Sequence, residues 1–185
     1  MNHWEKTNNV FYNQALNTFY NYGTRCFFSH EAGRSFGFAN SPLPETRRSI
    51  KCRDATKLED DAEYLFRWRR WANADHLYGV AAECGLKRLM LAFGMPYDTA
   101  QDRPGDSRDR VHANGVWDRF ESYRSGHAQG TGYVLPGSNP FHDWDVSQRY
   151  ASQSNFDRAR AQSHQSGAKV VRELIKKAQR EGLLI

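Results

Sequence analysis

The chain has 185 residues, a formal net charge of +5 from 26 basic and 21 acidic side chains, and a pI near 9.2. No apolar run approaches the roughly 18 residues of a membrane span, and the first nine residues lack the basic-then-apolar order of a secretory signal. With 39% hydrophobic and 14% aromatic residues, the chain is too apolar to be wholly disordered. We therefore expect a soluble cytoplasmic protein with one main domain and no membrane partner.

The cysteines exclude two classes of protein. Their number is odd and no Cys-x-x-Cys pair occurs, so the sequence predicts neither a disulfide framework nor a zinc knuckle. His112, His127 and His142 have no metal-ligand spacing to a cysteine or an acid, and no phosphate-binding glycine loop is present. We expect no metal and no cofactor.

The basic excess lies at the two ends of the chain, above all in the last forty residues, which hold eight basic and three acidic side chains. Such a distribution is a plausible electrostatic footprint for a phosphate-rich partner. The alternative is a helix face that is merely solvated.

Residues 1–53 predict an N-terminal extension that is partly irregular. Asparagines and aromatic residues are frequent there but follow no sustained period. One short helix could pass through Val10, Gln14, Leu16 and Phe19, whereas glycines and prolines interrupt the remainder. This extension would cover the main domain or stay loose.

Residues 54–185 predict an all-helical domain. The first helix begins near Asp54 or Thr56, which are good N-cap residues. Its buried stripe advances by steps of four and three residues. This stripe comprises Leu58, Ala62, Leu65 and Arg69, widened by Trp68 and Trp71.

A second helix is expected from 72 to 93, where Gly94 and then Pro96 supply the stop signal. Within this helix Glu83 and Lys87 are four residues apart and predict a salt bridge. Small residues would let a neighbouring helix approach closely. These are Ala81, Ala82 and Gly85.

The second half of the domain predicts two more helices, separated by loops at 96–109 and 125–139. The short third helix would carry Val111, Val116, Phe120 and Tyr123 on one side. The last helix spans about 154–182, with an apolar stripe opposite a basic face. The stripe comprises His164, Ala168, Val171, Ile175 and Ala178. The fold class is therefore all-α, a short up-down helical bundle.

Two stretches resemble the HEPN family (higher eukaryotes and prokaryotes nucleotide-binding). The segment 61–66 runs into the Ala-rich segment 72–87, which is similar to the first two HEPN helices. The run Trp144-Asp145-Val146-x-x-Arg149-Tyr150, followed by a long helix, is similar to the Arg-Tyr turn before the last helix of many members. The resemblance covers about 54–181.

This resemblance implies a helical bundle that often dimerises, in a homodimer or with an antitoxin-like protein. Its members range from metal-independent endoribonucleases of toxin and defence systems to non-catalytic modules that bind nucleotides or partners. The ribonuclease signature is an Arg followed closely by a His, and Arg158 and His164 match it with five residues between them. Ala159 departs from the pattern, because active members favour a polar residue directly after the Arg.

Metal-free RNA cleavage needs a base, an acid and positive charge for the transition state, which histidine and arginine supply. On one helix Arg158 and His164 would point about 240° apart, whereas Arg160 and His164 share a face. We expect Arg158 and His164 as catalytic residues. We expect RNA or nucleotide contacts from Arg149, Tyr150, Asp157 and Arg160. The alternative is a non-catalytic module that dimerises or binds a partner, with His164 in its core or interface.

Overall fold

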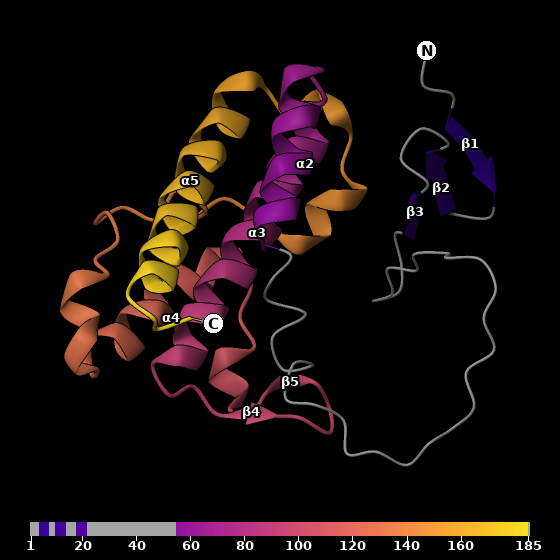
Figure 1. Cartoon of the computed structure of the whole chain (residues 1–185). Coiled ribbons are helices and arrows are strands. Elements are labelled where there is room, and N and C mark those ends of the chain that lie inside the picture. Colours follow the sequence, from indigo (N-terminus) through magenta and orange to yellow (C-terminus); the bar gives the residue numbers. More distant parts are fainter. Residues whose placement is uncertain (1–3, 8–9, 14–17, 22–54, 185) are drawn as a thin grey trace. The chain divides into compact units, whose positions relative to one another are not determined.

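The computed structural model describes residues 4–7, 10–13, 18–21 and 55–184. The chain divides into two units, residues 1–42 and 43–185, which we describe separately (Figure 1). The boundary predicted after residue 53 lies outside the described residues.

The first unit contains a three-stranded antiparallel sheet in the order β1-β2-β3, with β1 at Trp4–Thr7, β2 at Val10–Asn13 and β3 at Thr18–Asn21. Phe11 pairs with Tyr20 across the two later strands. The short helix predicted through this segment is therefore wrong. β-Branched and aromatic residues dominate β2 and β3 and favour an extended backbone once a neighbouring strand is available.

Four α-helices form most of the described part of the second unit: α2 at Ala55–Arg67, α3 at Trp71–Ala92, α4 at Ala113–Ser125 and α5 at Arg158–Arg180. The all-helical prediction is confirmed in the described part of this unit, apart from a small hairpin. The hairpin pairs β4 (Tyr97–Asp98) with β5 (Arg103–Pro104) inside the predicted loop. In this part of the chain, no helix is long and apolar enough to cross a bilayer.

Short 3₁₀ helices punctuate the connections between the α-helices. The predicted irregular connection 125–139 contains η3 and does not extend freely into solvent, because Tyr133 and Leu135 are buried in the core. Phe141 and Trp144 follow them into the same core. The 3₁₀ helices are η2 (Ser107–Asp109), η3 (Ala128–Gly132), η4 (Val146–Tyr150) and η5 (Gln153–Asn155).

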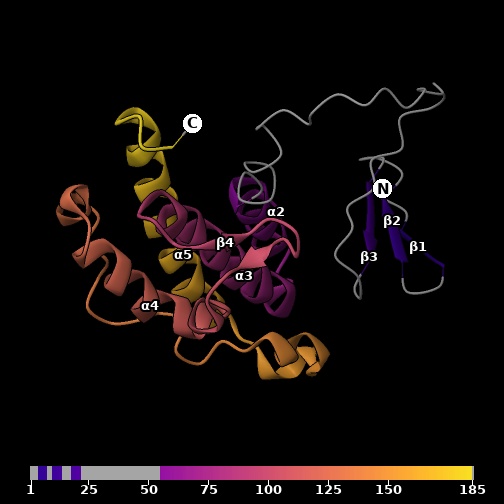
Figure 2. The ribbon, with the colours of Figure 1, turned by 90° about the horizontal axis from the view of Figure 1, so that it is seen from below.

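Helix α3 is the central element and packs against α2, α4 and α5 (Figure 2). Two glycines make this packing possible. A Cβ at Gly85 would lie 2.5 Å from the Val171 side chain of α5, and a Cβ at Gly79 would overlap the indole of Trp144. The prediction that small residues of this helix admit a close neighbour is confirmed at Gly85.

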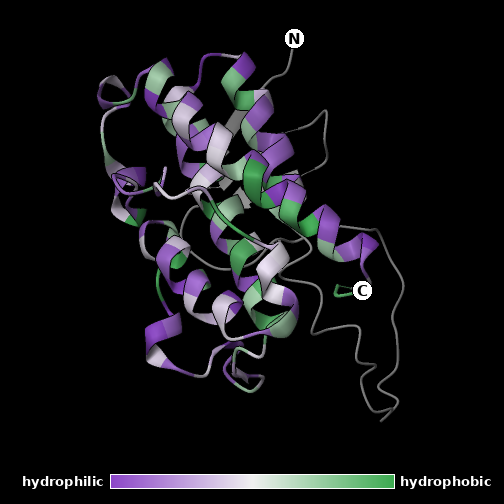
Figure 3. Ribbon diagram, turned by 90° about the vertical axis from the view of Figure 1, so that its left-hand side faces the viewer, coloured by the Kyte–Doolittle hydropathy of each residue, from purple (hydrophilic) through white to green (hydrophobic). Residues whose placement is uncertain are grey.

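Helix α5 has the two faces that its sequence predicts (Figure 3). All five members of the predicted stripe, from His164 to Ala178, are buried. Lys169, Lys176 and Arg180 are exposed on the other side. The hydrophobic edge buries against α3, which is what stabilises a helix that is otherwise rich in charge.

Candidate functional site

His164 lies in α5 with its side chain fully buried, at 0% exposure. Its Nε2 is 3.0 Å from Oδ1 of Asp143, and its ring stacks on Phe141 at 5.1 Å. Its Nδ1 is 2.7 Å from Oδ1 of Asp75 in α3, which is ion-pair distance, although the direction is poor for a hydrogen bond. Both ring nitrogens therefore face carboxylates of this chain.

Arg160 lies one turn earlier on the same face and contacts the same two carboxylates. Its Nε is 3.3 Å from Oδ1 of Asp75, and its Nη1 is 3.3 Å from Oδ2 of Asp143. Its Nη2 donates to the backbone oxygen of Asp143 at 2.7 Å and to the side-chain oxygen of Gln148 at 3.0 Å. The predicted shared face of Arg160 and His164 is confirmed. We call Asp75, Asp143, Arg160 and His164 the buried cluster.

The charges of the buried cluster lower the pKa of the Asp143 carboxyl. Partial burial acts to raise the pKa of this carboxyl, but the hydrogen bond from His164 and the charges of His164 and Arg160 outweigh it, so the pKa lies below its ordinary value. Buried charges are tolerated when they are paired in this way, and removing one partner leaves the other uncompensated. The buried cluster therefore holds α5 against α3 and against the segment that precedes η4.

The structure does not bring the predicted catalytic pair together. Arg158 is the first residue of α5 and is exposed, whereas His164 points into the core. Their separation of six residues places them on different faces of a continuous helix. The catalytic role of Arg158 and His164 stays a prediction, with His164 out of contact with solvent.

The other predicted site residues lie around the beginning of α5. Asp157 is the N-cap of α5 and accepts a hydrogen bond from the Arg160 backbone nitrogen at 2.8 Å. Arg149 and Tyr150 end η4, where the guanidinium lies 4.8 Å from the centre of the tyrosine ring. Tyr150 is 75% exposed, so its ring does not pack beneath the last helix.

At the turn between α2 and α3, two residues that the sequence places on the buried stripe are exposed instead. Trp68 is 67% exposed and does not widen the buried stripe of α2, and Arg69 is exposed beside it. The Arg69 nitrogen donates to the Phe66 oxygen at 3.0 Å and the Arg70 nitrogen donates to the Leu65 oxygen at 2.9 Å. This pair of bonds is the Schellman arrangement, which turns the chain away from the helix.

Arg69 occupies the position in this turn that most often holds glycine, with φ at +59°. A left-handed backbone costs an ordinary residue about 1–2 kcal/mol, so arginine at this position lowers the stability of the fold relative to glycine. Three arginines and two aromatic side chains are exposed at this turn. We call Tyr64, Arg67, Trp68, Arg69 and Arg70 the junction patch.

Contacts between the helices place the beginning of α5 at the same end of the bundle as the junction patch. Gln165 donates to Glu63 at 2.7 Å, and further along α5 Arg172 pairs with Asp60 at 2.7 Å, so α5 runs antiparallel to α2. The first residues of α5 thus lie beside the last residues of α2 (Figure 1). Arg158 belongs to this end.

Arg149 belongs to the same end, because its neighbour in η4, Gln148, accepts a hydrogen bond at 3.0 Å from Arg160 near the beginning of α5. Burial lowers the pKa of His76, and the positive charge of Arg149 lowers it further. His76 stacks on Trp144 with ring centres 5.4 Å apart. Five exposed arginines therefore gather here, and none of them forms an ion pair with residues 55–184. They are Arg67, Arg69, Arg70, Arg149 and Arg158.

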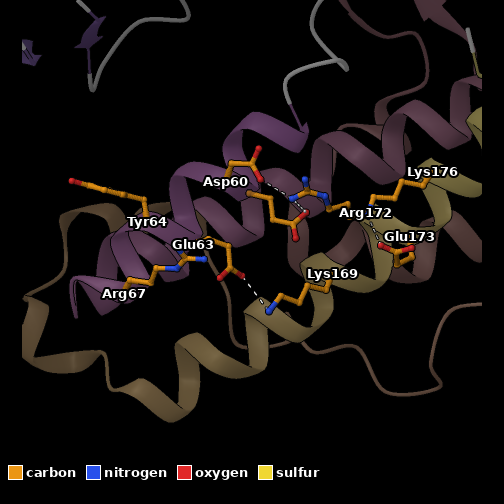
Figure 4. A pocket seen from close by; sticks show the side chains of 9 residues that line it. Asp60, Glu63, Tyr64, Arg67, Lys169, Arg172, Glu173 and Lys176 are labelled. Atoms are coloured by element: carbon orange, nitrogen blue, oxygen red, sulfur yellow. Dashed lines mark hydrogen bonds and ion pairs between the residues drawn. The ribbon is translucent and has the colours of Figure 1, made fainter. Parts of the chain in front are cut away.

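A shallow depression lies between α2 and α5 and, unlike the set of five arginines, holds mostly paired charges (Figure 4). Its charged side chains largely pair with one another, as in the 3.3 Å contact of Lys169 with Glu63 and the 2.7 Å contact of Lys176 with Glu173. Beneath them burial raises the pKa of Glu59, although Arg172 opposes this. Arg67 of the junction patch also lines the depression and has no ion pair there, but the remaining charges are neutralised internally, so this part of the depression does not point to a charged ligand.

Sequence reasoning missed two parts of the site. Asp143 lies in an irregular segment 21 residues before His164, and no local pattern connects the two. A sequence signal for the junction patch exists in the string Arg67-Trp68-Arg69-Arg70-Trp71, where arginines are interleaved with tryptophans. The same residues also fit the buried stripe of a helix, which is the simpler interpretation of the sequence. The predicted Glu83–Lys87 salt bridge is confirmed at 2.7 Å.

Residues 55–184 and the three strands hold no group of histidine, cysteine and acidic side chains that could bind a metal ion. Comparison with known proteins assigns no family to this chain. No family model matches the sequence, and neither a curated protein nor a solved structure shows a match to it.

Proposed function

We propose that the helical unit binds RNA through the basic end of the bundle. The observation that carries the proposal is the set of five exposed arginines without ion-pair partners among residues 55–184. Phosphate groups neutralise such charges and release their own condensed counterions, which is the main source of affinity in this kind of binding. Arginine suits the role because its planar fork binds phosphate oxygens in pairs.

The acidic residues at this end of the bundle have partners other than the five arginines. Asp145 and Asp157 are exposed there, and each accepts a backbone hydrogen bond as the cap of a helix, at 2.7 Å and 2.8 Å respectively. Asp75 and Asp143 are engaged by Arg160 and His164. None of these four carboxylates forms an ion pair with the five arginines.

The proposal is for binding without cleavage by His164. A general base must reach the proton that it removes, at about 2.6–3.2 Å or through one water. Both nitrogens of the fully buried His164 already face carboxylates, one from Asp75 in the core and one from the partly exposed Asp143. The HEPN resemblance agrees with this form of the proposal, because it implies non-catalytic nucleotide-binding members as well as ribonucleases.

The experiment measures fluorescence anisotropy of a labelled single-stranded RNA of about 12 nucleotides with the full-length protein. The variant R67Q/R69Q/R70Q removes three charges from the basic end. The matched control K169Q/K176Q/R180Q removes three charges from the exposed face of α5. We expect the first variant to lose at least ten-fold in affinity at low salt and the control less than three-fold.

A salt titration strengthens the same test. Each lost contact with a single strand lowers the slope of log K against log salt by about 0.7, so three lost contacts reduce it by about 2. Absence of RNA binding by the parent protein at low salt would overturn the proposal. Equal losses in the two variants would overturn the location.

A further inference from the structure

Two aromatic side chains of the junction patch lie in solvent instead of the core. Trp68 is 67% exposed and Tyr64 is 48% exposed. They are one helical turn apart, with ring centres 6.0 Å apart and planes tilted by 50°. Two exposed rings in contact form one continuous apolar surface, and such surfaces on a folded domain often mark a site of interaction.

The core does not lack aromatic residues at this turn. Phe66 and Trp71 pack edge to face at 4.9 Å, and Phe66 also contacts the buried Tyr78 at 6.3 Å. These residues already cover the end of the core where α2 passes into α3. Trp68, which is 67% exposed, therefore contributes little to the core, and most of its indole is accessible to an external partner.

Charge complementarity indicates the chemistry of that partner. Arg67 and Arg69 flank Trp68 in the chain and Arg70 follows, and all three arginines are exposed like the indole, so the surface around Trp68 is positively charged. An apolar protein partner would have to strip water from these guanidinium groups without giving them an anion. A nucleic acid offers an aromatic face and a phosphate within one nucleotide.

We infer that Tyr64 and Trp68 form a stacking surface for unpaired bases, which makes single-stranded RNA, and not a duplex, the ligand of the basic end. This inference rests on the proposed function and adds the class of RNA. In a duplex both faces of each base are covered by neighbouring bases, whereas an unpaired base can stack on a side chain. Because the two rings are tilted, a single base stacks on one ring at a time.

The test compares a labelled single strand with the duplex formed by annealing its complement, using the full-length protein at one salt concentration. Loss of one stacked base weakens binding by about five- to hundred-fold. For W68A we expect at least a ten-fold loss with the single strand and no more than a two-fold loss with the duplex. W68F should keep most of the single-strand affinity, because phenylalanine retains an aromatic face.

Two further measurements separate stacking from charge. R67Q should weaken single strand and duplex by the same factor, because both carry phosphates. An abasic ribose-phosphate oligomer should bind the parent protein at least as weakly as the ordinary single strand binds W68A, because it can stack on neither Trp68 nor Tyr64. Circular dichroism of each variant checks that the fold is kept, which the exposure of Trp68 predicts.

The outcomes distinguish the two proposals. If W68A lowers the affinity for single strand and duplex by the same factor, or lowers neither, the proposed stacking surface is wrong. The proposed basic interface still stands in that case, as long as R67Q lowers the affinity for both ligands. If the parent protein binds neither ligand at low salt, the proposed function is wrong and the inference falls with it.

Discussion

The buried cluster and the junction patch use similar residues in opposite ways. In the buried cluster Arg160 and His164 pair with Asp75 in the core and with the partly exposed Asp143 at its edge. In the junction patch the arginines and Trp68 face solvent, and Arg69 is held in a backbone conformation that arginine disfavours. The two regions lie at the same end of the helical unit.

The difference teaches where to look for function in this protein. A charged group that has found an internal partner contributes to the fold, and its removal is felt as lost stability. A charged group without a partner in the described chain contributes little to the stability of the fold, and its removal should lower the affinity for RNA. The predictions below separate these two quantities, stability and RNA affinity.

The largest loss of stability is expected from H164A. It leaves Asp75 buried beside a cavity with only Arg160 as a partner, and breaking a buried ion pair costs about 3–5 kcal/mol. Urea denaturation followed by circular dichroism measures the change. D143N should cost less, because Asp143 is partly exposed.

RNA affinity of the folded H164A protein, measured well below its denaturation midpoint, should stay within two-fold of the parent. A loss of affinity with no loss of stability would reverse the roles assigned to the two regions.

A smaller loss is expected from G79A. The new Cβ would overlap the indole of Trp144, which is buried beside Asp143, and overpacking of this kind costs about 1–3 kcal/mol. G137A is the matched control, because nothing lies within 4 Å of its Cβ. Thermal denaturation of both variants checks the prediction, and an equal melting temperature for G79A and G137A would contradict it.

In the junction patch, R69G should raise stability while it lowers affinity. Glycine removes the cost of the left-handed backbone but loses more entropy on folding, which leaves a net gain of about 0.5–1 kcal/mol. Chemical denaturation and RNA anisotropy on the same sample measure both effects. A variant that lost stability would show that the Arg69 side chain supports the fold.

The smallest expected effect concerns pH. The pKa of His76 is lowered in the folded protein, so between that pKa and the ordinary value near 6.5 the unfolded chain binds a proton that the folded chain does not. The stabilising contribution is complete above pH 6.5 and is lost as the pH falls below it. H76F keeps an aromatic ring against Trp144 and should flatten this part of the stability curve; an unchanged slope would assign the dependence to another group.

The helices of the second unit could be predicted from the sequence because their signals are local. The steps of four and three residues from His164 to Ala178 place one edge of α5 in the core, whatever it packs against. Gly94, with φ at +94°, comes directly after the C-cap of α3, as the sequence predicts. Glu83 and Lys87 meet because they are neighbours on one helix.

The N-terminal strands and the environment of His164 could not be predicted in this way, because both depend on distant partners. Val10 and Phe19 fit a short helix as well as strands until pairing with another strand decides between them. His164 fits the apolar stripe by its spacing, yet its charged neighbours come from α3 and from the segment before η4. Asp75 and Asp143 are 89 and 21 residues away in the chain.

The sequence by itself determined where the helices of the second unit lie and which of their faces are apolar, because helical periodicity is a property of neighbouring residues. Only the tertiary structure decided that His164 is enclosed by Asp75 and Asp143 while Trp68 is left in solvent. The physical reason is that burial and charge pairing depend on which segments the packing brings together, and the spacing along one helix carries no record of them.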